Sequence, residues 1–242
     1  KEKLMPLPKI NSPTYELVIP SSKKKIRYRP FLVKEEKILV IAMESNEIKD
    51  IATAVKQVLN NCILTRGIKI EKLSTFDIEY LFLNVRGKSV GESVDIKVTC
   101  PDDGETVVET TVNLDEIKVI HDPEHTKDIK LDETISMRMK YPSLNEFIQE
   151  NFDVENVGLD QSFDMISSCV DIIFNDEETW DAKDCTKKEI ITFLEQLGSK
   201  QFKELEKFFA TMPRLYHEIK VVNPKTKVEN TIPLEGLAAF FN

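Results

Sequence analysis

The chain has 242 residues, of which 41% are hydrophobic and 31% charged, and its formal net charge is −9 at pH 7. These proportions describe an ordinary globular protein that can bury a sizeable core, as one large domain or two small ones. The negative charge disfavours unaided binding to DNA or RNA, which needs clustered Lys and Arg, and no run approaches the roughly 18 consecutive apolar residues of a membrane span.

The first third of the chain is predicted to be a β-hairpin followed by three helices. Residues 15–19 and 25–29 carry strand-forming side chains on either side of a Pro-Ser-Ser turn. Helices are expected at about 34–45, 47–63 and 76–87, the second with apolar residues at three- and four-residue spacing along one face. The third helix has Ser or Thr before it as a cap and a glycine as its expected last residue.

The helix predicted at 34–45 is apolar around most of its circumference. Glu35, Glu36 and Lys37 can solvate one narrow face, and the remaining apolar stripe is wider than a surface helix needs. The helix is therefore either the central helix of an N-terminal lobe or a surface that another chain covers. Fully burying one such side chain stabilises either arrangement by about 1.5–3 kcal/mol, so the residues leave both open.

The middle of the chain changes to the period of a strand. Residues 93–100 alternate apolar and polar, a Pro-Asp-Asp-Gly turn follows, and the run 106–114 returns. Residues 134–141 alternate again, which predicts an antiparallel sheet of about four strands in this region.

The last third returns to helices and ends in a second hairpin. Helices are predicted at 143–151, 159–174, 189–198 and 200–209. Strands at 217–222 and 228–233 should form the closing hairpin, with an apolar tail at 234–242.

The predicted fold class is α+β, with an N-terminal hairpin and helices, a central antiparallel sheet, and C-terminal helices closed by a β-hairpin. The expected regions are 1–91, 92–141 and 142–242. The last of these is either a separate unit or continuous with the first.

Candidate catalytic and metal-binding side chains lack the spacing that their chemistry needs. Pro123 lies between His121 and His125 and denies them the shared helix face of a zinc-binding pair, and His217 stands alone. The acidic stretch 175–184 lacks the central glycine of a calcium loop. We therefore expect no catalytic residue, no cofactor, no metal and no small-molecule substrate.

The four cysteines are scattered without a C-x-x-C pair. The N-terminus has no apolar signal core, so we expect reduced thiols in a cytoplasm. Cys185 precedes a predicted helix, but no base stands beside it in the sequence, and a capping-region role is the simpler interpretation.

Three long blocks of mixed apolar and charged residues carry a family resemblance. They read SPTYELVIPSSKKKIRYRPFLVKEEKILVIAMES, FDIEYLFLNVRGKSVGE and WDAKDCTKKEIITFLEQLGSKQFKELEKFFATMPRLYHEI. Together they resemble the T-even-type phage baseplate protein family, whose members serve in baseplate hub assembly, over about Ser12 to Phe241.

The resemblance implies a chaperone-like assembly factor or a minor hub component that acts through protein–protein contacts. Its partners would be other phage baseplate, hub or tail assembly proteins, with no nucleic acid and no membrane. It would act in the host cytoplasm during assembly or in the virion baseplate. The alternative from another class is a cell-wall-directed hydrolase of the tail, which lacks a paired-carboxylate or His-centred site in the sequence.

Candidate partner-binding surfaces are the helix at 31–43, the helix at 76–86 and the segment 202–213, which ends in Met212-Pro213. The same side chain types also suit a core, so core packing is the alternative for each. The candidates are Phe31, Glu36, Ile41, Phe76, Tyr80, Phe208, Met212 and Leu215.

The turns of the two predicted hairpins depart from the family. Relatives often carry a C-P-x-C-G knuckle in the final hairpin and sometimes in the middle one. Here the turns read CPDDG at 100–104 and NPKTK at 223–227, so Cys100 alone remains. We expect these hairpins to be held by strand pairing and packing alone.

The loss of the knuckle cysteines predicts that the purified protein holds no stoichiometric zinc. Elemental analysis should find no zinc at a one-to-one ratio, and a chelator should leave the melting temperature unchanged. One zinc per chain, together with destabilisation by EDTA, would show that this interpretation of the turns is mistaken.

Overall fold

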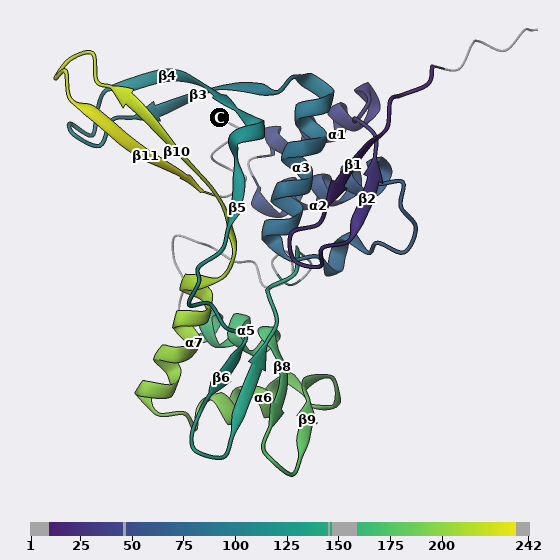
Figure 1. The fold of residues 1–242 in the computed structure, drawn as a ribbon, viewed down its shortest axis with the longest axis vertical. Coiled ribbons are helices and arrows are strands. Elements are labelled where there is room, and N and C mark those ends of the chain that lie inside the picture. The colour runs from purple at the N-terminus through teal and green to yellow at the C-terminus, as the bar shows by residue number, and fades with distance from the viewer. Residues whose placement is uncertain (1–9, 46, 145, 147–158, 236–242) are drawn as a thin grey trace, which may run out of the picture.

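The structure, a computed structural model, describes residues 10–45, 47–144, 146 and 159–235. Within these residues the buried apolar side chains form three clusters. Figure 1 shows two lobes, with an arm of long hairpins projecting from the upper one. The α+β class predicted from the sequence is confirmed.

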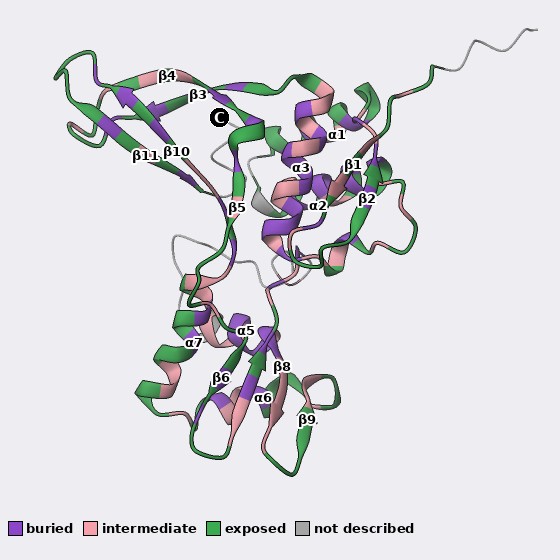
Figure 2. Ribbon diagram, viewed as in Figure 1, coloured by how far each residue is buried: buried purple, intermediate pink, exposed green. Residues whose placement is uncertain are grey.

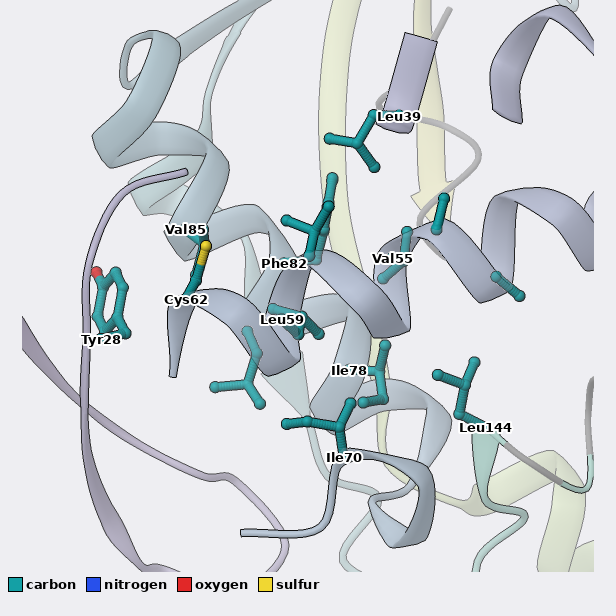
Figure 3. Packing of buried hydrophobic residues seen from close by; sticks show 14 of the residues in the cluster. Tyr28, Leu39, Val55, Leu59, Cys62, Ile70, Ile78, Phe82, Val85 and Leu144 are labelled. Carbon is teal, nitrogen blue, oxygen red and sulfur yellow. The ribbon is translucent and has the colours of Figure 1, made fainter. Parts of the chain in front are cut away.

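The first cluster joins the N-terminal hairpin to three helices, as the sequence predicts. Tyr15 pairs with Tyr28 in the antiparallel hairpin. Figure 3 shows Leu59 and Phe82 meeting between two of the helices, with Tyr28 of the hairpin at the side. The elements are β1 (Tyr15–Val18), β2 (Lys25–Tyr28), α1 (Val33–Glu44), α2 (Ile48–Cys62) and α3 (Thr75–Val90).

Helix α3 packs into two clusters at once. Ile78 and Phe82 belong to the first cluster, whereas Leu83, about a third of a turn further round the helix, belongs to the second. The expected end of this helix at Gly87 is wrong, because the helix continues to Val90. Gly87 faces Leu114, and a Cβ there would lie 3.7 Å from Leu114 Cδ1, which is an ordinary van der Waals contact.

A buried carboxylate ties the first hairpin to α3. Asp77 Oδ1 accepts a hydrogen bond from the Ser21 backbone N–H at 2.9 Å, and its other oxygen accepts one from Ser74 Oγ at 2.6 Å. Ser74 occupies the N-cap position as expected, but it makes no side-chain cap and donates to Asp77 instead.

The second cluster lies between two long hairpins that form the arm. In the first hairpin Ser93 pairs with Asn113 and Thr99 with Val107. In the second, the long strand pairs with its hairpin partner and, near its start, with a short third strand. The elements are β3 (Ser93–Thr99), β4 (Val107–Asn113), η2 (Leu114–Glu116), β5 (Lys118–Ile120), β10 (Arg214–Val222) and β11 (Glu229–Glu235).

The third cluster fills the lower lobe. An antiparallel sheet of order β6-β7-β8-β9 packs against three helices. Met137, Met139, Leu205 and Phe208 are among its fully buried side chains. The elements are β6 (Asp128–Lys130), β7 (Ser136–Met139), α5 (Leu159–Cys169), β8 (Val170–Phe174), β9 (Thr179–Asp181), η3 (Ala182–Asp184), α6 (Lys187–Leu194) and α7 (Ser199–Thr211).

The strands expected to form one central sheet are divided among three. β3 and β4 form a two-stranded sheet of their own, and β5 pairs with β10. β3 and β4 pack with the closing hairpin, whereas β6 and β7 pair with β8 and β9. The predicted helix at 159–174 ends at Cys169, and the β-branched run after it forms β8 against β7. The division of the chain into 1–91, 92–141 and 142–242 stays a prediction. The helix expected at 143–151 and the tail after Glu235 lie mostly outside the described residues.

Hydrogen bonds between side chains join the turns of the two arm hairpins. Asn223 is 0% exposed, and its Nδ2 donates to Asp102 Oδ1 at 2.9 Å. Thr226 Oγ1 donates to the other oxygen of Asp102, and Asn230 Oδ1 accepts the Asp102 backbone N–H at 3.1 Å. These hydrogen bonds hold the pKa of Asp102 below its usual value. The expectation of strand pairing and packing alone is therefore incomplete.

Removing the Asn223 side chain should loosen the arm. We expect Asn223→Ala to lower the free energy of unfolding by roughly 1–3 kcal/mol, because it removes the bond to Asp102 and the side-chain acceptor of Lys225 N. Asn175→Ala is the matched control, since Asn175 accepts backbone N–H groups within its own turn alone. Denaturant unfolding checks this. Equal losses in the two variants would show that the bond between the turns does not stabilise the arm.

Candidate interaction surface on helix α1

A buried ion pair fixes the start of helix α1. Glu35, in the first turn, has a side chain that is 0% exposed and accepts from Arg29 Nη2 at 3.0 Å. Its second oxygen accepts the Leu32 backbone N–H at 2.8 Å. Arg29 also donates from Nη1 to Pro30 O at 2.9 Å, and its backbone N–H donates to Cys62 O at 3.0 Å. The end of β2, the start of α1 and the end of α2 are therefore linked.

This link selects the side of α1 that faces the core. Glu35, Leu39 and Ala42 are buried, and their spacing of four and three residues places them on one side of the helix. Burial raises the pKa of Glu35, but Arg29, the Leu32 N–H and Lys34 outweigh it, so the pKa lies below its usual value. The carboxylate is charged at neutral pH and keeps its partner.

The opposite side of α1 exposes apolar side chains to solvent. Val33 is 67% exposed, Val40 49% and Ile41 68%. Leu32 and Met43 flank them and are also exposed. The colouring in Figure 2 shows α3, by contrast, buried along much of its length. Helix α1 therefore packs into the first cluster on one side only. That another chain covers its exposed side stays a prediction.

Charged side chains lie among the apolar ones on this side of the helix. We call this surface the α1 face and define it as Val33, Glu36, Lys37, Val40, Ile41 and Glu44. Glu36, Lys37 and Glu44 are exposed and make no ion pair within the described part of the chain. Apolar side chains with charged neighbours are typical of protein–protein contact surfaces, in which the apolar part is desolvated and the charges set orientation.

The predicted partner-binding residues fall into three groups. Glu36 and Ile41 lie exposed on the α1 face, and Phe31 lies half-buried beside it. Tyr80 and Met212 are half-buried elsewhere. Phe76, Phe208 and Leu215 are at most 2% exposed, so core packing describes these three side chains.

Sequence reasoning missed Val33 and Val40 as surface residues. Helical periodicity could have placed them opposite Leu39 and Ala42, but only if Glu35 had been identified as the buried member of its charged triplet. The signal was available in Arg29, a cation six residues earlier at the end of a strand.

The side chains with potential for acid–base chemistry have structural roles. Thr211 Oγ1 donates to Lys207 O at 2.8 Å, so His125 Nδ1 donates to Thr211 at 3.0 Å and His125 Nε2 accepts from Tyr141 at 3.0 Å. Burial and the nearby Lys127 lower the pKa of His125. The imidazole is therefore neutral at pH 7, and its ring packs against Tyr141 and Phe208.

Two buried thiols are also unsuited to nucleophilic attack. Burial raises the pKa of Cys62 to about 11 and that of Cys169 to about 12, so both are protonated at neutral pH. Across the described ranges, no group of three His, Cys, Asp or Glu side chains is placed to hold a metal ion.

A hollow of about 320 Å³ beside α7 is lined largely by charged side chains, including Lys130, Lys200 and Glu204. Small-molecule sites are more often lined by apolar groups with a few polar ones. The helices in the described part of the chain lack the combined length and hydrophobicity that a membrane span requires.

Comparison with protein families finds a match over nearly the whole chain. A family model described as T4 bacteriophage base plate protein matches residues 12–242. No curated protein and no solved structure matches the chain. The matched range includes α1, both arm hairpins and the lower lobe.

The Arg29–Glu35 pair predicts a specific loss of stability in acid. Folding lowers the pKa of Glu35. The ionised carboxylate therefore contributes its full stabilisation at pH values above the unfolded pKa of about 4.3, and this stabilisation is lost as the pH falls through the folded pKa. Glu35→Gln should lower the free energy of unfolding at pH 7 by roughly 1–3 kcal/mol and flatten its decline in acid.

Glu36→Gln is the control, because Glu36 is the next residue on the helix but exposed. Chemical unfolding from pH 7 to about pH 3 measures both variants, a range that spans the unfolded carboxylate pKa. If Glu35→Gln and Glu36→Gln declined in parallel with the unchanged protein, the ion pair would not fix α1.

Proposed function

We propose a function from one premise: the chain belongs to the T4 bacteriophage base plate protein family. It is a phage baseplate protein, and we propose that it acts in building the baseplate hub by binding other baseplate proteins. It serves as a chaperone-like assembly factor or as a minor hub component, and it catalyses no covalent step.

The observation that carries this proposal is the exposed apolar side of α1. Single apolar residues on a surface are common, but Val33, Val40 and Ile41 gather on one side of one helix. Their helix is held in place by a buried ion pair rather than by apolar contacts on all sides. A pre-formed helical face of this kind suits docking on a groove or helix of another protein.

A cell-wall hydrolase would need a carboxylate pair or an activated nucleophile. Support for the non-enzymatic proposal comes from the structural roles of His125, Cys62 and Cys169 in the described residues. A peptidoglycan zymogram tests the hydrolase alternative, and a cleared band would overturn the non-enzymatic proposal.

The assembly-factor and hub-component versions differ in the final location of the protein. An assembly factor acts in the host cytoplasm and leaves, whereas a hub component remains in the virion baseplate. Mass spectrometry of purified particles separates them, because stoichiometric peptides of this chain are expected for the hub component alone.

A charge on the α1 face should abolish partner binding without unfolding the protein. Ile41→Asp places a carboxylate at an exposed position, so we expect its circular dichroism spectrum and melting temperature to stay close to those of the unchanged protein. In a pull-down from infected cells during tail assembly, this variant should lose the baseplate proteins that the unchanged protein retains, since an unpaired charge in a desolvated contact is costly.

Two further variants serve as controls for Ile41→Asp, one at an exposed position and one at a buried position. Val222→Asp places the same charge at an exposed position on the arm and should retain binding. Leu39→Asp, on the buried side of α1, should unfold the protein. A folded Ile41→Asp protein that captures baseplate proteins normally would refute the proposed use of this face.

A further inference from the structure

The outermost line of α1 has the spacing of a coiled-coil seam. Val33, Lys37, Val40 and Glu44 follow one another at intervals of four, three and four residues, opposite the buried Glu35 and its neighbours. A seam of this spacing can pack against a second helix along its length. A second helix that packs here must match the charges of Lys37 and Glu44.

The two charges on the seam complement those of the same helix run in reverse. When two copies of α1 lie antiparallel about a two-fold axis between Val40 and Ile41, Lys37 of each copy meets Glu44 of the other. Val40 and Ile41 of both copies then lie next to the two-fold axis, and both side chains are exposed in the single chain. Each copy supplies one cation and one anion, so the contact forms two ion pairs from one sequence.

A parallel pairing of the same helices would repel. It would place Lys37 beside Lys37 and Glu44 beside Glu44, and like charges at such positions are destabilising. The same seam therefore favours the antiparallel orientation in a contact between identical chains. Both charges are free to take part, since neither makes an ion pair among the described residues.

We infer that the α1 face binds a second copy of this chain as an antiparallel, two-fold symmetric helix pair. This inference rests on the proposed function, in which the α1 face is a contact surface. It identifies a second copy of the chain as the partner of that face in the purified protein. With the axis between Val40 and Ile41, residues 37–44 of the two α1 helices lie alongside each other over about 12 Å, so the contact is smaller than the roughly 800 Å² per partner of a standard interface. The dimer is therefore weak and exchanges, which leaves the face available to a baseplate partner.

Sedimentation velocity of the purified full chain from about 1 to 200 µM tests the inference, a range that brackets a micromolar dissociation constant. We expect a monomer–dimer equilibrium in this range. Lys37→Glu and Glu44→Lys should each weaken the dimer roughly tenfold or more, because each replaces two attractions by two repulsions. Lys203→Glu, at an exposed position on α7, is the control and should not change the equilibrium.

Two restorations make the test specific to the antiparallel arrangement. The double variant Lys37→Glu with Glu44→Lys should regain the dimer of the unchanged protein. An equimolar mixture of the two single variants should form a heterodimer, because both cross-pairs are then attractive. All these substitutions lie at exposed positions, so folding can be confirmed by circular dichroism.

A chain that stays monomeric at the highest concentration would overturn the inference, as would a dimer that neither single reversal weakens or that the double variant does not restore. If the chain is monomeric but Ile41→Asp still abolishes capture of baseplate proteins, the two-fold pairing fails and the proposed function stands.

Discussion

The buried ion pair between Arg29 and Glu35 decides which side of helix α1 meets the core. Without it, α1, whose sequence is apolar around most of its circumference, could turn more of that circumference inward. Burying two charges costs free energy that close geometry and further hydrogen bonds must offset, and here Glu35 has both Arg29 and the Leu32 N–H. The pair thus favours one orientation of α1, and the consequence is that Val33, Val40 and Ile41 remain on the outside.

The same principle recurs where the chain joins distant segments. Asp77 ties the first hairpin to α3, and Asp102 ties the turns of the two arm hairpins through Asn223. In each case a carboxylate accepts hydrogen bonds from side chains or N–H groups far away in sequence. At the arm, the contact lies at the turns for which the family resemblance implies cysteine knuckles in relatives. Polar contacts thus position the apolar clusters of this fold and leave the α1 face uncovered.

Much of the local structure follows from the sequence alone. Turn residues and periodicity act over short distances, so the sequence predicts several elements to within a residue or two. These are the first hairpin, α1 and α2; the strands of the closing hairpin are slightly longer than predicted. The pairing of β10 with β5 and the division of the middle strands among three sheets depend on contacts between segments that are far apart in the sequence. Alternation identifies a strand but not its neighbours. It cannot show that the helix ends at Cys169 and that Val170–Phe174 forms a strand paired with β7. Two of the six residues of the α1 face, Glu36 and Ile41, are predicted from the sequence. Placing Val33 and Val40 there required knowing that Glu35 is buried.

The central claim is that this baseplate protein contacts other chains through the exposed side of α1. The most direct test places a photo-crosslinking amino acid at position 41 in one variant and at position 222 in another, both exposed in the isolated chain. After irradiation of cells in which tails are being assembled, position 41 is predicted to crosslink to a baseplate protein or to a second copy of this chain, and position 222 is not. Crosslinks at position 222 with none at position 41 would contradict the account.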